Sequence, residues 1–333
     1  MTEVKKEKLE GLEYDEEGFR ISTPPQIAAY KAERLTTESI ADLGAGNGIQ
    51  SLYFARTSKR VISVDNSGER LAISRNNAKK EGITNIEFIL GDALDGETIK
   101  KVGKVDLVNS DPSRKRSEGR WEFSLLSPNP IDVIEKYKCE SFSFDLPPLM
   151  PASLIPGNWE IEYLSLYGEL KRMLTYVGGA IKFERSALTL PSRKRIVFDY
   201  NIERNVNPLR VPLHYIYDLD SSLLVSGLIP EFTHHRDLWL LHSDSQRVLA
   251  TSEKLVKDPF LFRTYSIIDT APTVSTLKQK LSKLKAGKVF IRFSIEPSNY
   301  YIEKRNLERE LNGKRDLYLF KLGEVFYLAS KVG

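Results

Sequence analysis

A glycine-rich turn constrains this chain more than any other stretch. Glycines stand at the alternate positions 44, 46 and 48 in the letters A-D-L-G-A-G-N-G, Ala41–Gly48. The apolar run Ser39–Leu43 leads into the turn, and the helical pattern Ile49–Arg56 follows it. Glycine is needed where the backbone turns sharply and approaches a ligand, because a Cβ atom would obstruct both. The stretch predicts a buried strand, a ligand-binding turn and a helix, with a tight turn that binds nothing as the alternative.

A second apolar run, Arg60–Val64, ends on an acid, Asp65, which stands 21 residues after Gly44. At this position a carboxylate can accept hydrogen bonds from the two hydroxyls of a ribose. The spacing G-x-G-x-G differs from the dinucleotide pattern G-x-G-x-x-G and resembles motif I of the class I S-adenosylmethionine (SAM) methyltransferases. This resemblance implies a SAM site with the contacts Asp42, Gly44, Ala45, Gly46, Gly48, Asp65 and Asn66.

A third predicted strand, Ile86–Leu90, is followed directly by the letters G-D-A, Gly91–Ala93. An acid in this place can accept a hydrogen bond from the amino group of an adenine. We therefore expect Asp92 to contact the adenine of the cofactor, with Ala93 beside it. Capping of the loop is the alternative role for Asp92.

The fourth predicted strand, Lys104–Ser110, runs into the letters D-P-S-R. In an open α/β sheet, ligands bind outside the carboxyl ends of the strands, so this segment is expected at the mouth of the ligand crevice. A carboxylate there can orient a nucleophile and accept its proton, a proline stiffens the turn, and an arginine fork suits phosphate. The alternative is a strand-ending turn with exposed basic residues. The predicted catalytic residues are Asp111, Pro112, Ser113 and Arg114, and Asp111 is also expected to contact the cofactor.

The remaining patterns up to residue 204 are expected to complete a seven-stranded mixed sheet with its covering helices. The predicted helices are Phe19–Leu35, which has two prolines in its first turn, Ser67–Glu81 and Trp159–Val177. The predicted strands are Ser141–Pro148, Ala180–Leu190 and Arg195–Tyr200. In the first helix, Pro24, Gln26 and Tyr30 are candidates for a ligand contact, and covering the sheet edge is the alternative for each.

From Asn205 onward the pattern changes and predicts a separate, smaller α+β region. A strand and a short helix are expected over Pro212–Leu228. Further elements are expected in the order β-α-β-α-β, with the helices on one face of the sheet. Their ranges are Phe260–Ile268, Thr276–Leu284, Lys288–Phe293, Ile302–Leu311 and Leu317–Leu328.

Positive charge is concentrated near the C-terminus. The segment Val274–Gly333 has thirteen Lys or Arg against six Asp or Glu, whereas the whole chain of 333 residues carries a formal charge of +4. Such a basic region is suited to a phosphate backbone, where each contact releases counterions. A solvated lysine-rich surface is the alternative.

Composition excludes several classes of protein. No apolar run approaches the roughly 20 residues that span a bilayer, so no membrane segment is expected. The first ten residues alternate charges, which is untypical of a signal peptide. One cysteine cannot form an internal disulfide, which favours the cytoplasm. With one Cys and four His, a structural zinc site is not expected, and neither is any other metal centre.

Taken together, these motifs resemble a family of class I SAM-dependent methyltransferases that carry a C-terminal THUMP-like domain. The resemblance covers nearly the whole chain and implies a fold of a Rossmann-like seven-stranded methyltransferase domain followed by a smaller α+β domain. The implied boundaries are a helical extension over 1–38, the methyltransferase domain over 39–204 and the THUMP-like domain over 205–333. The matching segments are F-R-I-S-T-P-P-Q-I-A-A-Y-K-A-E-R-L, D-L-G-A-G-N-G, S-D-P-S-R, I-E-Y-L-S-L-Y-G-E-L-K, Y-I-Y-D-L-D-S-S-L-L-V-S-G-L, F-R-T-Y-S-I-I-D and K-V-F-I-R-F-S-I-E-P.

One departure bears on the substrate. Relatives that methylate amino groups of nucleic-acid bases usually end the fourth strand with D/N-P-P and an aromatic residue that stacks on the base. Ser113 and Arg114 occupy those places here, so stacking is either missing or supplied from elsewhere, with Trp121 and Phe123 as candidates. THUMP domains occur in RNA-modifying enzymes, so the resemblance implies RNA, with tRNA first, as the partner of the basic C-terminal domain.

Three functions are compatible with these features. The first is a SAM-dependent methyltransferase that acts on RNA. The second is a methyltransferase that acts on a protein or a small molecule, in which the basic tail is only a surface. The third is a SAM-binding RNA module without catalytic activity.

Overall fold

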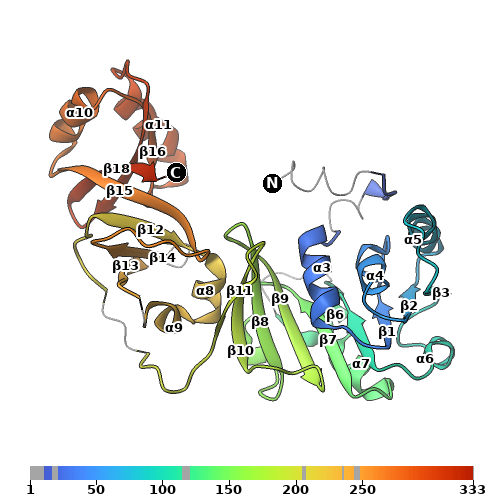
Figure 1. The fold of residues 1–333 in the computed structure, drawn as a ribbon. Coiled ribbons are helices and arrows are strands. Elements are labelled where there is room, and N and C mark those ends of the chain that lie inside the picture. Colours follow the sequence, from blue (N-terminus) through green and yellow to red (C-terminus); the bar gives the residue numbers. More distant parts are fainter. Residues whose placement is uncertain are drawn as a thin grey trace. The chain divides into compact units, whose positions relative to one another are not determined.

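The computed structural model describes residues 11–16, 22–114, 121–204, 208–234, 236–243 and 248–332. The chain divides into two compact units (Figure 1). The N-terminal unit comprises Met1–Leu166 and Leu170–Phe198, and the C-terminal unit comprises Tyr167–Glu169 and Asp199–Gly333. Among the described residues, no helix has the length and apolar character needed to cross a bilayer.

A nine-stranded sheet forms the centre of the N-terminal unit, in the order β11-β10-β8-β9-β7-β4-β1-β2-β3. Five neighbouring strands, from β7 to β3, run parallel to one another. Such strands are buried on both faces, which explains their apolar runs. The strands are β1 Ser39–Leu43, β2 Arg60–Asp65, β3 Ile86–Leu90, β4 Leu107–Ser110, β7 Ser141–Leu146, β8 Glu160–Leu166, β9 Glu169–Gly178, β10 Arg185–Leu190 and β11 Lys194–Val197.

The predicted helix over Trp159–Val177 is wrong, because this segment forms strands β8 and β9. Tyr167 and Gly168 between them both have positive φ, 53° and 77°. Two successive left-handed residues are typical of the two-residue turn of a β-hairpin. The sheet therefore has nine strands, and the prediction of seven is also wrong.

The helices of the N-terminal unit are α3 Pro25–Arg34, α4 Ile49–Phe54, α5 Gly68–Lys80, α6 Gly96–Val102 and α7 Pro130–Lys136. Helices α3 and α4 pack on the same face of the sheet, since Ile27 and Phe54 share a core cluster with Ile40 of β1 and Leu107 of β4. The predicted helices near α3, α4 and α5 are confirmed, as are the first five parallel strands. A short ribbon pairs β5 Ser113–Arg114 with β6 Leu126–Ser127.

The C-terminal unit contains a seven-stranded sheet in the order β13-β14-β12-β15-β18-β17-β16. Its strands are β12 Tyr215–Leu219, β13 Trp239–Ser243, β14 Val248–Ser252, β15 Leu261–Ala271, β16 Ala286–Ile291, β17 Arg315–Leu322 and β18 Val325–Val332. Its helices are α8 Ser221–Ser226, α9 Ile229–Thr233, α10 Val274–Lys283 and α11 Pro297–Glu308.

Most of the predicted C-terminal elements are confirmed. Helices α10 and α11 contribute Leu277 and Leu307 to one core cluster, so both cover the same face of the sheet, as predicted. The single strand expected over Leu317–Leu328 is wrong, because this segment is the hairpin of β17 and β18 with a turn at Gly323, φ 59°.

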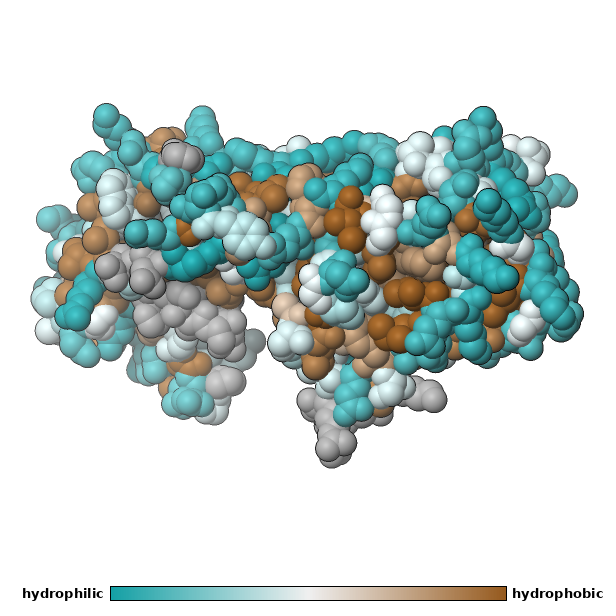
Figure 2. Space-filling view, turned by 90° about the horizontal axis from the view of Figure 1, so that it is seen from below, coloured by the Kyte–Doolittle hydropathy of each residue, from teal (hydrophilic) through white to brown (hydrophobic). Residues whose placement is uncertain are grey.

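Figure 2 shows one face of the molecule, where apolar side chains lie in patches between hydrophilic ones.

Candidate active site

A pocket of about 600 Å³ lies at the carboxyl ends of the parallel strands. The chain crosses from β1 to β2 and β3 on one side and returns to β4 on the other, so the strand order reverses beside β1. This reversal is the place where open α/β sheets bind ligands, and the volume is in the usual range for a small-molecule site. Of the residues predicted for cofactor binding and catalysis, all except Gly48 line the pocket: Asp42, Gly44, Ala45, Gly46, Asp65, Asn66, Asp92, Ala93, Asp111, Pro112, Ser113 and Arg114.

The glycine turn is held against β2 by its own backbone. The N–H groups of Gly44 and Ala45 both donate to the carbonyl of Val64, at 2.9 and 3.0 Å. Gly44, Gly46 and Gly48 have φ of 75°, 55° and 79°, a region that other residues rarely adopt. A Cβ on Gly46 would meet no atom within 4 Å. Gly46 therefore leaves its backbone open toward the pocket.

Gly48 has a different role, because it lies between helices rather than in the pocket. It is the N-cap of α4, and a Cβ there would stand 1.9 Å from Oγ of Ser74 on α5. Gly48 thus permits the close approach of α4 to α5, and its predicted contact with the cofactor remains a prediction.

Gly48→Ala is expected to lower the free energy of unfolding by about 2–4 kcal/mol. The estimate adds the cost of a left-handed alanine, roughly 1–2 kcal/mol, to that of a small overpacking. Gly82→Ala is the matched control, because Gly82 also has positive φ, 68°, but a Cβ there would meet nothing within 4 Å. Urea unfolding of both variants measures the difference, and equal losses would contradict a packing role for Gly48.

Asp65 is fixed in place by two backbone donors. Its Oδ2 accepts from the N–H of Gly46 at 2.7 Å, and its Oδ1 accepts from the N–H of Ser67 at 2.9 Å. Each carboxylate oxygen has a second lone pair. The carboxylate lines the pocket and can accept further donors there, as the ribose hypothesis requires.

A buried polar row crosses four parallel strands just below the pocket. Ser63, Asp42, Asn109 and Ser143 stand opposite one another in register, and all are almost fully buried. Asp42 accepts from Asn109 Nδ2 at 2.8 Å and from Ser51 Oγ at 2.6 Å. Burial raises the pKa of Asp42. This carboxylate is thus largely occupied by protein donors, although it lines the pocket.

Asp92 and Ala93 follow β3 at the rim of the pocket. Asp92 is exposed, and its Oδ1 accepts from the N–H of Leu94 at 2.8 Å. The capping role is therefore confirmed, and the second oxygen leaves the adenine contact compatible with the geometry. The carbonyl of Ala93 accepts from the hydroxyl of Tyr137 at 2.7 Å, which anchors the loop to the end of α7.

The D-P-S-R segment leaves β4 and enters the β5–β6 ribbon. Ser113 Oγ donates to the carbonyl of Ser127 at 3.2 Å. The guanidinium of Arg114 lies 3.7 Å from the ring centroid of Trp121, a cation–π contact. The structure thus brings one of the two candidate aromatic residues to Arg114, whereas Phe123 packs against Trp159 with ring centroids 5.7 Å apart.

Asp111 is an exposed residue of the pocket lining, although protein atoms crowd its carboxyl group. Burial, and then the charge of Asp145, raise the pKa of Asp111 to about 6. The cations Arg172 and Lys31 oppose this rise, and Asp42 adds to it. A carboxyl with a pKa near neutrality is suited to accept a proton during a reaction.

Four charged residues of the pocket were not predicted from the sequence: Lys31, Arg70, Asp145 and Arg172. Asp145 is the last but one residue of β7, and Lys31 of α3 forms an ion pair with its Oδ1 although both side chains are buried. Arg172 of β9 lies on the other side, with its Nε 3.6 Å from Asp145 Oδ2. The available signal was the acid of D-L-P-P at the end of a strand, Asp145–Pro148.

The ligand candidates on the first helix are corrected by the structure. Pro24, Gln26 and Tyr30 are not among the pocket residues, whereas Lys31 is. Tyr30 instead donates to both oxygens of Glu162, at 2.7 and 2.8 Å, because its side chain points toward β8.

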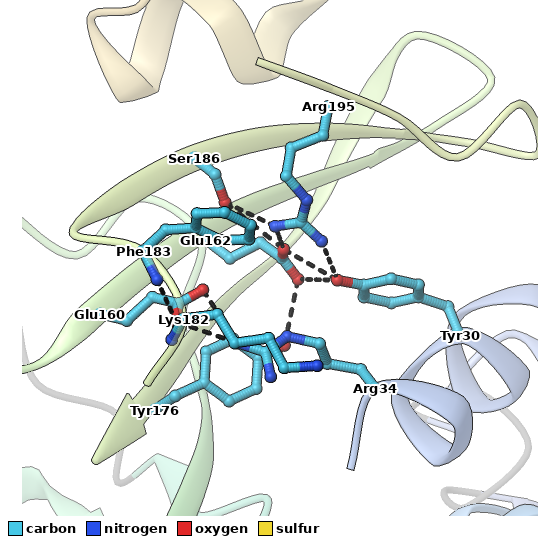
Figure 3. Close-up of polar contacts among 9 residues, drawn as sticks. All are labelled: Tyr30, Arg34, Glu160, Glu162, Tyr176, Lys182, Phe183, Ser186 and Arg195. Carbon is cyan, nitrogen blue, oxygen red and sulfur yellow. Dashed lines mark hydrogen bonds and ion pairs between the residues drawn. The ribbon is translucent and has the colours of Figure 1, made fainter. Parts of the chain in front are cut away.

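A buried network anchors α3 to the outer strands of the sheet, as Figure 3 shows. Glu162 also accepts from the hydroxyl of Tyr176 at 3.0 Å and forms an ion pair with Arg195. One helical turn on, Nη2 of Arg34 donates to both carboxylate oxygens of Glu160, at 2.9 and 3.1 Å. Since Lys31 lies between Tyr30 and Arg34 in α3, the network holds it at Asp145.

The charges of the pocket nearly balance. Its lining includes five aspartates and four basic side chains, which leaves one formal negative charge when all are ionised. They are Asp42, Asp65, Asp92, Asp111 and Asp145 with Lys31, Arg70, Arg114 and Arg172.

The fold and the pocket define a class. A parallel sheet with a glycine turn after its first strand, an acid at the end of its second strand and a pocket at the strand reversal is the architecture of the class I methyltransferases. Residues 36–139 match the family model described as "Methyltransferase domain". This part of the chain is therefore similar to a methyltransferase domain, for which SAM is the cofactor.

Individual relatives agree with this assignment. An uncharacterized RNA methyltransferase from Leptospira interrogans is 25% identical over 181 residues, 49% of this chain and 45% of that protein. A second one, from Clostridium tetani, is 32% identical over 151 residues, 40% of this chain and 33% of that protein. A protein-L-isoaspartate O-methyltransferase from Methanoculleus marisnigri is 32% identical over 83 residues, 24% of this chain and 37% of that protein. The chain spans less than half the length of each.

One solved structure matches nearly the whole chain. It is a candidate methyltransferase from Porphyromonas gingivalis W83, with a TM-score of 0.76 and 19% identity, and the match covers 96% of this chain and 83% of that one. At this identity the likeness shows the fold alone.

The residues of the pocket fit SAM. The open backbone at Gly46 leaves room for close approach, and the fixed carboxylate of Asp65 has spare lone pairs for hydroxyl donors. SAM carries one net positive charge from its sulfonium, ammonium and carboxylate groups, which complements the single formal negative charge of the lining.

Proposed function

We propose that the protein is a SAM-dependent methyltransferase that acts on RNA, with tRNA as the first candidate. The observation that supports it best is that one pocket combines the glycine turn, Asp65 and the accessible carboxylate of Asp111. The names of the Leptospira and Clostridium relatives favour RNA as the substrate. The basic C-terminal segment is consistent with this choice.

In this proposal each part of the pocket has one task. The glycine turn, Asp65 and Asp92 hold the cofactor, which supplies an electrophilic methyl group on its sulfonium. Asp111 orients the attacking group of the substrate and accepts its proton. Holding the reacting groups in line at ~3 Å supplies much of the acceleration. Arg114, whose guanidinium lies over the ring of Trp121, contacts a phosphate or a base of the substrate in this proposal.

Asp65→Asn is expected to weaken cofactor binding by about 10–100-fold, because a hydrogen bond to a charged group contributes roughly 1.5–3 kcal/mol. Calorimetry with S-adenosylhomocysteine measures the affinity. Asp95→Asn is the control, since Asp95 only caps α6 and does not line the pocket. Unchanged affinity in Asp65→Asn would contradict the ribose contact.

The C-terminal unit is proposed as a THUMP-like domain that docks the RNA. Several lysines of α10 and the residues after it are exposed, namely Lys278, Lys283, Lys285 and Lys288. Lys280 differs, because it is paired with Asp269 at 2.5 Å. The exposed lysines provide charge that a phosphate backbone can use.

The substrate class is tested by titrating unmodified tRNA transcripts at two salt concentrations. RNA binding through phosphate contacts predicts an affinity that falls steeply with salt, in proportion to the number of contacts. Weak binding with little dependence on salt would favour a protein or a small molecule as the substrate instead.

A further inference from the structure

Asp145 is a second carboxylate of the pocket, close enough to Asp111 for its charge to raise the pKa of Asp111. It is 3% exposed, and its Oδ1 is paired with the buried ammonium of Lys31. Among the described residues, Asp145 Oδ2 has no hydrogen-bond donor. Arg172 is the nearest cation, but its Nε is 3.6 Å away and itself lacks a hydrogen-bond acceptor in the described chain.

The unpaired oxygen of Asp145 is suited to accept a hydrogen bond from a ligand. A carboxylate paired with two cations is ionised, and an ionised carboxylate only accepts hydrogen bonds. A buried acceptor left without a donor is unfavourable, because it has lost its hydrogen bonds to water. A ligand group that fills the space between Asp145 and Asp111 therefore binds most favourably if it presents two N–H or O–H donors, one for each carboxylate.

The rest of this side suits a flat ring. Leu146, Pro147 and Pro148 follow Asp145, and Pro128 comes from the loop after β6; all four line the pocket. These side chains are apolar and cannot donate or accept hydrogen bonds. An aromatic ring can lie against them while its polar substituent meets the two carboxylates.

We propose that Asp145, together with Asp111, selects an amino group as the methyl acceptor, which in RNA is the exocyclic amine of a base. This inference rests on the proposed function and specifies its substrate atom. An amine offers two N–H donors, whereas a ribose hydroxyl offers one and a ring carbon none. Lys31 and Arg172 act as positioning residues that keep Asp145 ionised and aligned.

The reaction balances without a further reactant. The nitrogen lone pair forms the new N–C bond, and the methyl–sulfur bond breaks with its electron pair left on sulfur. The nitrogen proton passes to the carboxylate of Asp111. Asp145 is held by its ion pairs and keeps the second N–H aligned.

The groups that face Asp111 allow two variants with opposite effects. Asp145 of β7 and Asp42 of β1 raise its pKa, and Arg172 of β9 and Lys31 of α3 lower it. Asp145→Asn should therefore move the pH profile of methyl transfer to lower pH, and Arg172→Gln should move it to higher pH. A merely structural role for these residues does not predict shifts of opposite sign.

The test uses the full-length protein, SAM and unmodified tRNA transcripts, with single-turnover rates from pH 5 to 9 and mass spectrometry of the nucleosides. Asp145→Asn is expected to slow transfer by about 10-fold or more, because the amine loses a hydrogen bond to a charged acceptor, with affinity for S-adenosylhomocysteine within about 2-fold of wild type. Asp132→Asn, an acid of α7 outside the pocket, should match wild type. The methyl group should be found on an exocyclic nitrogen.

Three results would overturn the inference or its basis, and they are distinguishable. A methyl group on carbon or on ribose oxygen overturns the selection of an amine. An active wild type with an unchanged rate and pH profile in both Asp145→Asn and Arg172→Gln overturns the role of Asp145 alone. A wild type that binds S-adenosylhomocysteine but methylates no RNA overturns the proposed function, and the inference with it. Arg172→Gln serves as the test if Asp145→Asn does not fold.

Discussion

Asp111→Asn is expected to reduce methyl transfer by about 10²–10⁴-fold, the usual contribution of a general base. The amide keeps the size of the side chain but cannot accept the proton that leaves the nucleophile. In the wild type, the rate should fall as the pH drops through about 6, because the pKa of Asp111 is raised to this value and the protonated form has lost its basicity. Rates measured from pH 5 to 9 test both expectations.

Measurements of cofactor affinity and thermal stability distinguish the role of Asp111 as a general base from damage to the fold. Affinity for S-adenosylhomocysteine should change little in Asp111→Asn. Thermal stability should not fall near neutral pH, because the substitution removes a carboxylate that is unfavourable in its ionised form. A variant that retains wild-type rates, or a wild-type rate independent of pH between 5 and 7, would contradict the role of Asp111.

The second large effect concerns the network that holds α3. Glu162→Gln is expected to lower the free energy of unfolding by about 3–5 kcal/mol, the cost of removing one partner from a buried ion pair. The side chain is fully buried and accepts from Tyr30, Tyr176, Ser186 and Arg195. Without its charge, Arg195 keeps a largely buried guanidinium with no carboxylate beside it. Urea unfolding measures the loss.

An exposed pair of the same type provides the control. Glu87 and Arg60 are joined at 2.7 Å across β3 and β2, with side chains 54% and 40% exposed. Glu87→Gln should therefore cost no more than about 1 kcal/mol. Similar losses in Glu87→Gln and Glu162→Gln would contradict the view that burial makes the network important. Since α3 carries Lys31, Glu162→Gln should also slow methyl transfer.

The cofactor side of the pocket could be predicted because its elements are local in sequence. The glycine turn, the acid that ends β2 and the D-P-S-R segment each follow an apolar run. The hydrophobic pattern and the turn-forming residues after it are sufficient to place them at strand ends. Asp65 and Asp111 were found in this way. The identity of the cofactor, which was inferred from this local pattern, was predicted correctly.

The substrate side depends on pairs that are far apart in sequence. Lys31 and Asp145 are separated by 114 residues, and no local pattern indicates that a lysine in a helix is buried. Glu160 and Glu162 were assigned to the predicted helix over Trp159–Val177. Acidic side chains are rarely buried in a strand, so the sequence did not indicate that β8 is buried. Their partners, Arg34 and Arg195, become visible only once the sheet is assembled. Strands β8 and β9 of the nine-stranded sheet were not predicted, because the partners of their buried acids are far away in sequence.

The most direct test of the central claim is the transfer of labelled methyl groups from SAM to unmodified RNA. Wild-type protein is predicted to transfer the label to tRNA transcripts, and Asp111→Asn is predicted to bind S-adenosylhomocysteine normally while transferring almost none. Label that appears in protein or in small molecules but not in RNA, or equal transfer by wild type and Asp111→Asn, would contradict the account.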